Sequence, residues 1–188
     1  MADQMGMTLQ LASNVARMTW YSGINWVVQR QSRRITIPAG FTPTGPVPAR
    51  NELLADVREL LRADAEAVRE GLYPPGNEET ANPLEHLRRL RDMFQDLPDL
   101  VSRRKERDAT SVQDVVDGDL PDYFTQDFHF QTGGYLTEGS ARLYDVQVET
   151  LFYGAAAAMR RAGLRSIAQF MQGKDQRHVS WVDVACGT

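Results

Sequence analysis

Apolar residues recur at helical spacing through most of this chain, and that periodicity constrains the fold more than any other feature. Residues 52–70 place their leucines and valines on one face, with charged residues such as Asp64 on the other. Residues 83–97 and 138–162 repeat the pattern, and residues 5–34 form a proline-free stretch of the same kind. The expected buried face of that stretch carries Met7, Leu11, Val15, Met18 and Trp20. A period of about 3.6 residues is that of a half-buried α-helix, so the sequence predicts a mainly α fold.

Start and stop residues set the expected limits of the three later helices. Asn51 is the predicted cap of the first, and Gly71 is expected to close it in a left-handed conformation. Asn82 is the predicted cap of the second, and Pro98 is expected to end it. Gly163 is expected to end the third, before a shorter helix that leads towards the C-terminus.

Composition excludes several classes of protein. The chain has 188 residues and a net charge of −4, so it lacks the overall positive field of a nucleic-acid binder. No stretch approaches the roughly 20 apolar residues that a membrane span requires. A single cysteine, Cys186, excludes an intramolecular disulfide and fits a reducing compartment. We expect a cytoplasmic protein, with a plastid or other organelle as the alternative because residues 4–51 are rich in arginine and free of acids.

The last residues of the sequence predict a strand that leads into a ligand-binding turn. An apolar run over 178–182 precedes Asp183, and small residues follow it. Strand, acid and glycine-rich turn is how a Rossmann-type nucleotide-binding unit opens. We therefore expect the first strand of a truncated Rossmann-like α/β domain after the helices. Without neighbouring strands, residues 178–184 should be extended but poorly supported.

This C-terminal pattern resembles the first motif of class I S-adenosylmethionine-dependent methyltransferases, in which an acid is followed by alternating glycines. Asp183 matches the acid, Ala185 replaces the first glycine and Gly187 matches the second. The segment over 127–149, which begins Asp-Phe-His-Phe-Gln-Thr-Gly-Gly-Tyr-Leu, is similar to a cyanobacterial and plastid-type group of quinone-biosynthesis-like methylases. The resemblance covers roughly residues 120–188 well and the earlier helices loosely.

The resemblance implies a cofactor, a substrate class and a set of site residues. The cofactor would be S-adenosyl-L-methionine and the partner a small-molecule methyl acceptor. We expect no metal site, because the acids over 114–122 are not spaced as in a calcium-binding loop. Asp183, Ala185 and Gly187 would bind the cofactor, and Gln131 and Tyr135 are further candidate contacts. Catalytic residues stay unassigned. We expect weak or undetectable cofactor binding by this chain, because the pocket for the adenosine half is missing.

The sequence predicts three parts, and a second interpretation of the chain's function remains open. Residues 1–50 would be a helical segment with a proline-rich loop, 51–173 a helical cap or lid, and 174–188 the first strand and the start of the glycine-rich loop. The alternative is an autonomous helical module for protein interaction or regulation, without catalysis. Likewise, the aromatic segment over 123–136 would either cover the cofactor pocket or fill the core beneath the helices.

Overall fold

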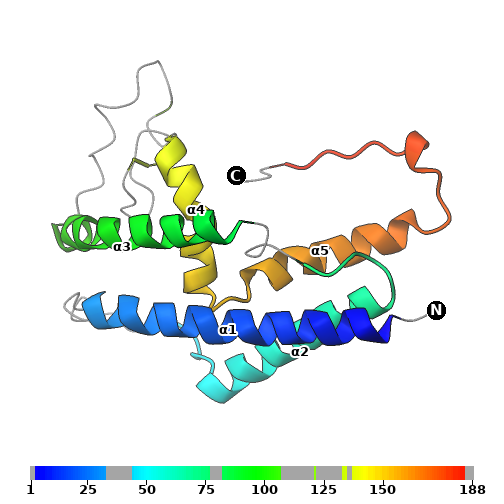
Figure 1. Cartoon of the computed structure of the whole chain (residues 1–188), viewed down its shortest axis with the longest axis horizontal. Helices are drawn as coiled ribbons and strands as arrows, with labels where there is room; N and C mark the ends of the chain where they lie inside the picture. The colour runs from blue at the N-terminus through cyan, green and yellow to red at the C-terminus, as the bar shows by residue number, and fades with distance from the viewer. Residues whose placement is uncertain are drawn as a thin grey trace. The chain divides into compact units, whose positions relative to one another are not determined.

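The secondary structure of the described part of the chain is helical, without strands, as the periodicity predicted. The computed structural model describes residues 3–32, 44–76, 82–106, 121, 133–134 and 137–184, and these contain five α-helices and no strand (Figure 1). The helices are α1 (Gln4–Ser32), α2 (Arg50–Arg69), α3 (Pro83–Glu106), α4 (Glu138–Leu151) and α5 (Ala156–Met171), followed by the short 3₁₀ helix η3 (Gln176–His178).

The polarity of α1 is the reverse of the prediction. Gln10, Asn14 and Arg17 are buried together with Tyr21. The residues expected to be buried include Leu11, Val15 and Trp20, which are exposed instead. The prediction was wrong because a helix buries whichever stripe finds partners, and here the partners are polar groups of α2 and α5.

The N-terminus of α2 differs from the prediction and its C-terminus matches it. The capping position is Ala49, not Asn51, and the backbone N–H of Ala49 donates to Oε2 of Glu52 at 2.6 Å. At the other end Gly71 has a φ of +74°. The following N–H, that of Leu72, donates to the carbonyl of Ala67 at 3.0 Å, the arrangement that commonly closes a helix with a left-handed glycine.

Helix α3 begins where the sequence predicted and ends later. Asn82 caps it, because the N–H of Glu85 donates to its Oδ1 at 3.2 Å. Pro98 lies inside the helix, which continues to Glu106, so its prediction as a stop was wrong. Proline removes one backbone hydrogen bond, yet the last turn carries three basic residues that interact favourably with the helix C-terminus (Arg103, Arg104 and Lys105).

The helix expected over 138–162 is two helices, joined by a turn over 152–155. Tyr153 and Gly154 have φ angles of +54° and +83°, which no α-helix accommodates. A Cβ on Gly154 would lie 2.7 Å from the carbonyl oxygen of Arg17, so the turn packs directly against the backbone of α1. Gly163 lies within α5, which continues to Met171, so its prediction as a helix end was wrong.

The strand expected near the C-terminus is not formed by the described residues. The chain passes from η3 into an extended segment at Val179, whose φ and ψ are −114° and 125°. Within the described part of the molecule, residues 180–184 make no backbone hydrogen bond. A strand exists only through a ladder with a neighbour, and none of the described segments supplies one.

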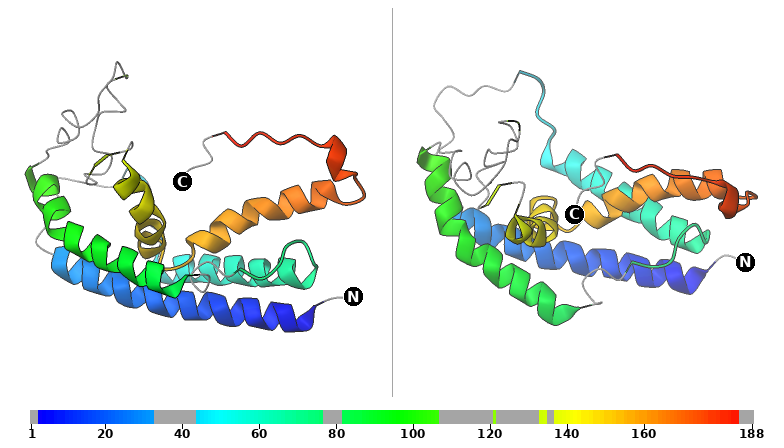
Figure 2. Two further views of the ribbon diagram at one scale, coloured as in Figure 1. Left: turned by 45° about the horizontal axis from the view of Figure 1, so that its top comes forward. Right: turned by 90° about the horizontal axis from the view of Figure 1, so that it is seen from above.

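The described residues fall into two compact units. One contains residues 3–23, 44–76 and 151–184, in which α1, α2 and α5 lie side by side (Figure 2). The other contains the rest, including the end of α1 with α3 and α4. In this second unit the amide of Asn25 donates to the carbonyl of Thr150 at 2.8 Å, and Arg142 pairs with Asp92 at 2.7 Å.

Candidate functional site

Of the residues predicted to bind a cofactor, Asp183 is described and the others lie outside the described residues. Asp183 is exposed on the extended segment after η3. The others are Ala185, Gly187, Gln131 and Tyr135.

An aromatic contact joins the segment around Asp183 to α5. The ring of Trp181 meets the ring of Phe170 edge-on, with centroids 5.8 Å apart. Beyond it Val182 and Val184 are 85% and 84% exposed. These are apolar side chains of the kind that a parallel sheet buries on both faces.

A buried polar cluster in the first unit was missed by the sequence reasoning. We call Gln10, Asn14, Asp64, Tyr73 and Arg161 the Asp64 cluster. It joins three helices, since Gln10 and Asn14 come from α1, Asp64 from α2 and Arg161 from α5. Asp64 is 3% exposed, so its assignment to the solvent face of its helix was wrong.

Both carboxylate oxygens of Asp64 accept several hydrogen bonds. Oδ1 accepts from Nε of Arg161 at 2.8 Å and from the hydroxyl of Tyr73 at 3.0 Å. Oδ2 accepts from Nη2 of Arg161 at 3.0 Å, from the amide of Gln10 at 2.7 Å and from the amide of Asn14 at 2.8 Å. The two-pronged contact with Arg161 is the geometry in which a guanidinium binds a carboxylate most strongly.

The donors in this cluster determine how Asp64 and Tyr73 titrate. Burial by itself raises the pKa of Asp64, but the hydrogen bonds from Arg161, Asn14 and Gln10, together with the charge of Arg161, outweigh it and hold the pKa below its usual value. Burial and the neighbouring Asp64 carboxylate raise the pKa of Tyr73 to about 12. The cluster therefore contains a charged carboxylate, a charged guanidinium and a neutral phenol at neutral pH.

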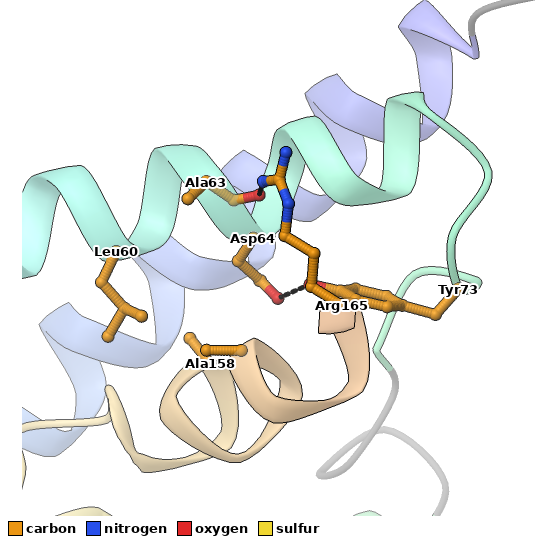
Figure 3. A pocket seen from close by; sticks show the side chains of 7 residues that line it. Leu60, Ala63, Asp64, Tyr73, Ala158 and Arg165 are labelled. Atoms are coloured by element: carbon orange, nitrogen blue, oxygen red, sulfur yellow. Dashed lines mark hydrogen bonds between the residues drawn. The ribbon is translucent and has the colours of Figure 1, made fainter. Parts of the chain in front are cut away.

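A small hollow lies beside the cluster. It is lined by Leu60, Ala63, Asp64, Tyr73, Ala158, Ala162 and Arg165, and Figure 3 shows Tyr73 directed at Asp64 across it. Arg165 bounds the hollow and donates to the carbonyl of Ala63 at 3.4 Å. With a volume of about 50 Å³ it has room for a water molecule or two but not for a substrate.

The geometry of the Asp64 cluster indicates a structural role. A general base needs a lone pair free for the substrate proton, and the lone pairs of Asp64 are occupied by protein donors. A buried ion pair with all its partners in place fixes how elements pack. A sequence signal existed, because Gln10, Asn14, Arg17 and Tyr21 are spaced four, three and four residues apart like a helical stripe.

Comparison with models of known protein families, with curated proteins and with solved structures finds no match for this chain. Within the described residues no group of three or more His, Cys, Asp and Glu side chains could hold a metal ion. None of the described helices is both long enough and apolar enough to cross a membrane.

Proposed function

We propose that this chain is the N-terminal helical part of a class I S-adenosylmethionine-dependent methyltransferase. One observation carries the proposal: the segment that contains Asp183 exposes its valines, and residues 180–184 make no backbone hydrogen bond to the described part of the chain. Val182 and Val184 flank Asp183 and are almost fully exposed. A segment of this kind is stable when it becomes a strand of a larger sheet, and Asp183 then lies at the end of that strand beside the ligand-binding turn.

In this proposal each motif residue has a separate task. Asp183 accepts a hydrogen bond from the cofactor, directly or through water. Ala185 and Gly187 lack bulk, so the cofactor can lie against the backbone of the turn. Gln131 and Tyr135 contact the cofactor or the methyl acceptor from the helical side. Transfer itself depends on holding the nucleophile of the acceptor in line with the sulfonium methyl group.

The alternative is an autonomous helical interaction module, and it has an observation in its favour. The first unit contains a buried polar cluster and a buried run of alanines that do not involve residues 181–184 (Ala155, Ala156, Ala157 and Ala158). A unit of this kind can fold without a catalytic domain. Exposed apolar side chains on α1 would then serve a partner and not a cofactor.

Calorimetric titration with S-adenosyl-L-methionine separates the two functions. The proposal expects binding by a protein extended beyond Thr188 through the next strand and helix of its reading frame, and weak or no binding by the 188-residue chain. An extended, folded protein that does not bind the cofactor would contradict the methyltransferase assignment. Tight binding by the 188-residue chain would instead place the site within the helices.

A further inference from the structure

Helix α1 exposes an apolar seam along the face opposite its buried polar stripe. Met5, Leu9, Ala12, Ala16, Thr19 and Gly23 are all exposed, and we call them the α1 seam. Met5 and Leu9 are 74% and 54% exposed, and the exposed side chains of Val15 and Trp20 flank the seam. All six seam positions belong to the part of α1 in the first unit.

The spacing of the α1 seam is that of a coiled coil. Successive members are four, three, four, three and four residues apart, which gives the period of 3.5 that keeps one stripe facing a partner helix. Small and apolar side chains at this spacing are the pattern by which one helix packs along another. The surface therefore fits another helix better than a flat or irregular partner.

The charges on α1 indicate that the partner helix is a second copy of α1 and that it runs antiparallel. From Gln4 to Gln29 the only charged side chain is Arg17, which is buried, so the seam and its flanks are neutral. The exposed charges stand at the two ends, Asp3 at the start and Arg30 near the finish. Two antiparallel copies of α1 place the end that carries Asp3 on the same side as the end that carries Arg30 of the other copy, whereas two parallel copies place like charges at the same end.

The side-chain sizes in the seam also match an antiparallel copy. With the twofold axis at Asn14, Met5 lies opposite Gly23 of the second copy and Leu9 lies opposite Thr19. Ala12 then faces Ala16, and these small residues let the two helices approach closely. Large side chains thus meet small ones towards the ends of the seam and small ones meet each other at its centre, which lets the two helices pack closely.

We propose that the α1 seam is a homodimer interface, in which two copies of this chain pair α1 against α1 in antiparallel orientation. The interface is independent of the cofactor motif and of the methyltransferase assignment. It covers Met5 and Leu9, two of the exposed apolar side chains that the rest of the described chain leaves in solvent.

Sedimentation equilibrium of the full chain, from micromolar to millimolar concentration, tests the interface. We expect a reversible monomer–dimer equilibrium. Leu9→Glu should weaken it by about a hundredfold, since two buried charges enter each dimer and tenfold corresponds to 1.4 kcal/mol. Leu11→Glu is the matched control, because Leu11 is also an exposed leucine of α1 but lies off the seam, and its dissociation constant should stay near that of the parent.

Circular dichroism shows whether each variant keeps its helices, and both substitutions are at exposed positions. A chain that sediments as a monomer throughout, or equal dissociation constants for Leu9→Glu and Leu11→Glu, would overturn the proposal. A dimer whose dissociation constant is unchanged by both substitutions would also overturn it, because such a dimer forms through another surface.

Disulfide trapping in a Cys186→Ser background tests the orientation. A mixture of an Ala12→Cys chain with an Ala16→Cys chain should form cross-linked dimers, because these positions face each other in the antiparallel pair. Each chain alone should cross-link far less. Efficient cross-linking of Ala12→Cys with itself would indicate a parallel pair and contradict the proposed arrangement.

Discussion

At the scale of single residues, the first unit depends on Asp64 and Arg161. Their side chains are 1% and 9% exposed, and the atoms that join them are 2.8 Å apart. The pair is stable because neighbouring amides and a hydroxyl complete its hydrogen bonds. Removing either charge leaves the other buried and uncompensated.

We predict that Asp64→Leu and Arg161→Met each destabilise the chain by about 3–5 kcal/mol, while the double variant loses much less than the sum. Urea denaturation followed by circular dichroism measures all three. Arg177→Met is a suitable control, because that arginine pairs with Asp175 on the surface and its loss should change little. Additive losses from Asp64 and Arg161 would mean that the two side chains are not coupled.

The pKa of Asp64 predicts how stability responds to acid. Its folded pKa is depressed, so its contribution is present above the unfolded value near 4 and is lost as the pH falls through the lower folded value. Stability should therefore hold from neutral pH down to about 4 and fall below it. Thermal unfolding across this range, with Asp64→Asn as the comparison, measures the effect, and an equal acid loss in both proteins would contradict it.

The raised pKa of Tyr73 predicts that stability falls in base. Its folded pKa is raised to about 12, so its contribution is complete below the usual tyrosine value near 10 and is lost as the pH rises towards 12. Tyrosinate absorbance, taken as the difference between the parent and Tyr73→Phe, should show one phenol that ionises near the raised value. A difference spectrum that titrates near pH 10 would show that Tyr73 is not held by Asp64.

At the scale of helices and turns, the break between α4 and α5 depends on Gly154, one of its two residues with a positive φ. Gly154 combines a φ of +83° with a close approach to the carbonyl of Arg17, so a side chain there meets both strain and a clash. Gly173 has a similar φ of +74° but nothing within 4 Å, so a side chain there meets strain alone. Gly173 is therefore a control for Gly154, because the two differ in the contact and not in the backbone conformation.

We predict that Gly154→Ala destabilises the chain by about 2–5 kcal/mol and Gly173→Ala by about 1–2 kcal/mol. Denaturant unfolding of both variants gives the comparison. The difference between them reports the contact of the turn with α1. If the two substitutions had equal effects, the turn would not press on the backbone of α1 in solution.

At the scale of the whole molecule, the methyltransferase proposal predicts how the motif residues act in a protein extended beyond Thr188. Gly187→Val should abolish binding of S-adenosyl-L-methionine, because a branched side chain would occupy the place of the ligand. Asp183→Ala should weaken binding by about 1–3 kcal/mol, the scale of one lost hydrogen bond to a charged group. Calorimetry measures both, and circular dichroism should show the helices unchanged. If both variants bound the cofactor as tightly as the parent, Asp183 and Gly187 would not belong to a cofactor-binding motif.

The sequence by itself determined the helical class and several boundaries, because these depend on local chemistry. Apolar spacing in α2 and α3, the Asn82 cap and the left-handed Gly71 each act within a few residues of themselves. The motif around Asp183 also reads locally as strand, acid and turn, although the function built on it remains a proposal.

Only the tertiary structure decided which face of α1 is buried, where the α4–α5 helix breaks and why Asp64 lies inside. Each depends on groups far apart in the sequence: Asp64 meets Gln10 and Arg161, and Gly154 meets Arg17. The spacing of apolar residues cannot predict that a polar stripe of α1 is buried. The free energy that stabilises its burial comes from hydrogen-bond partners on other helices.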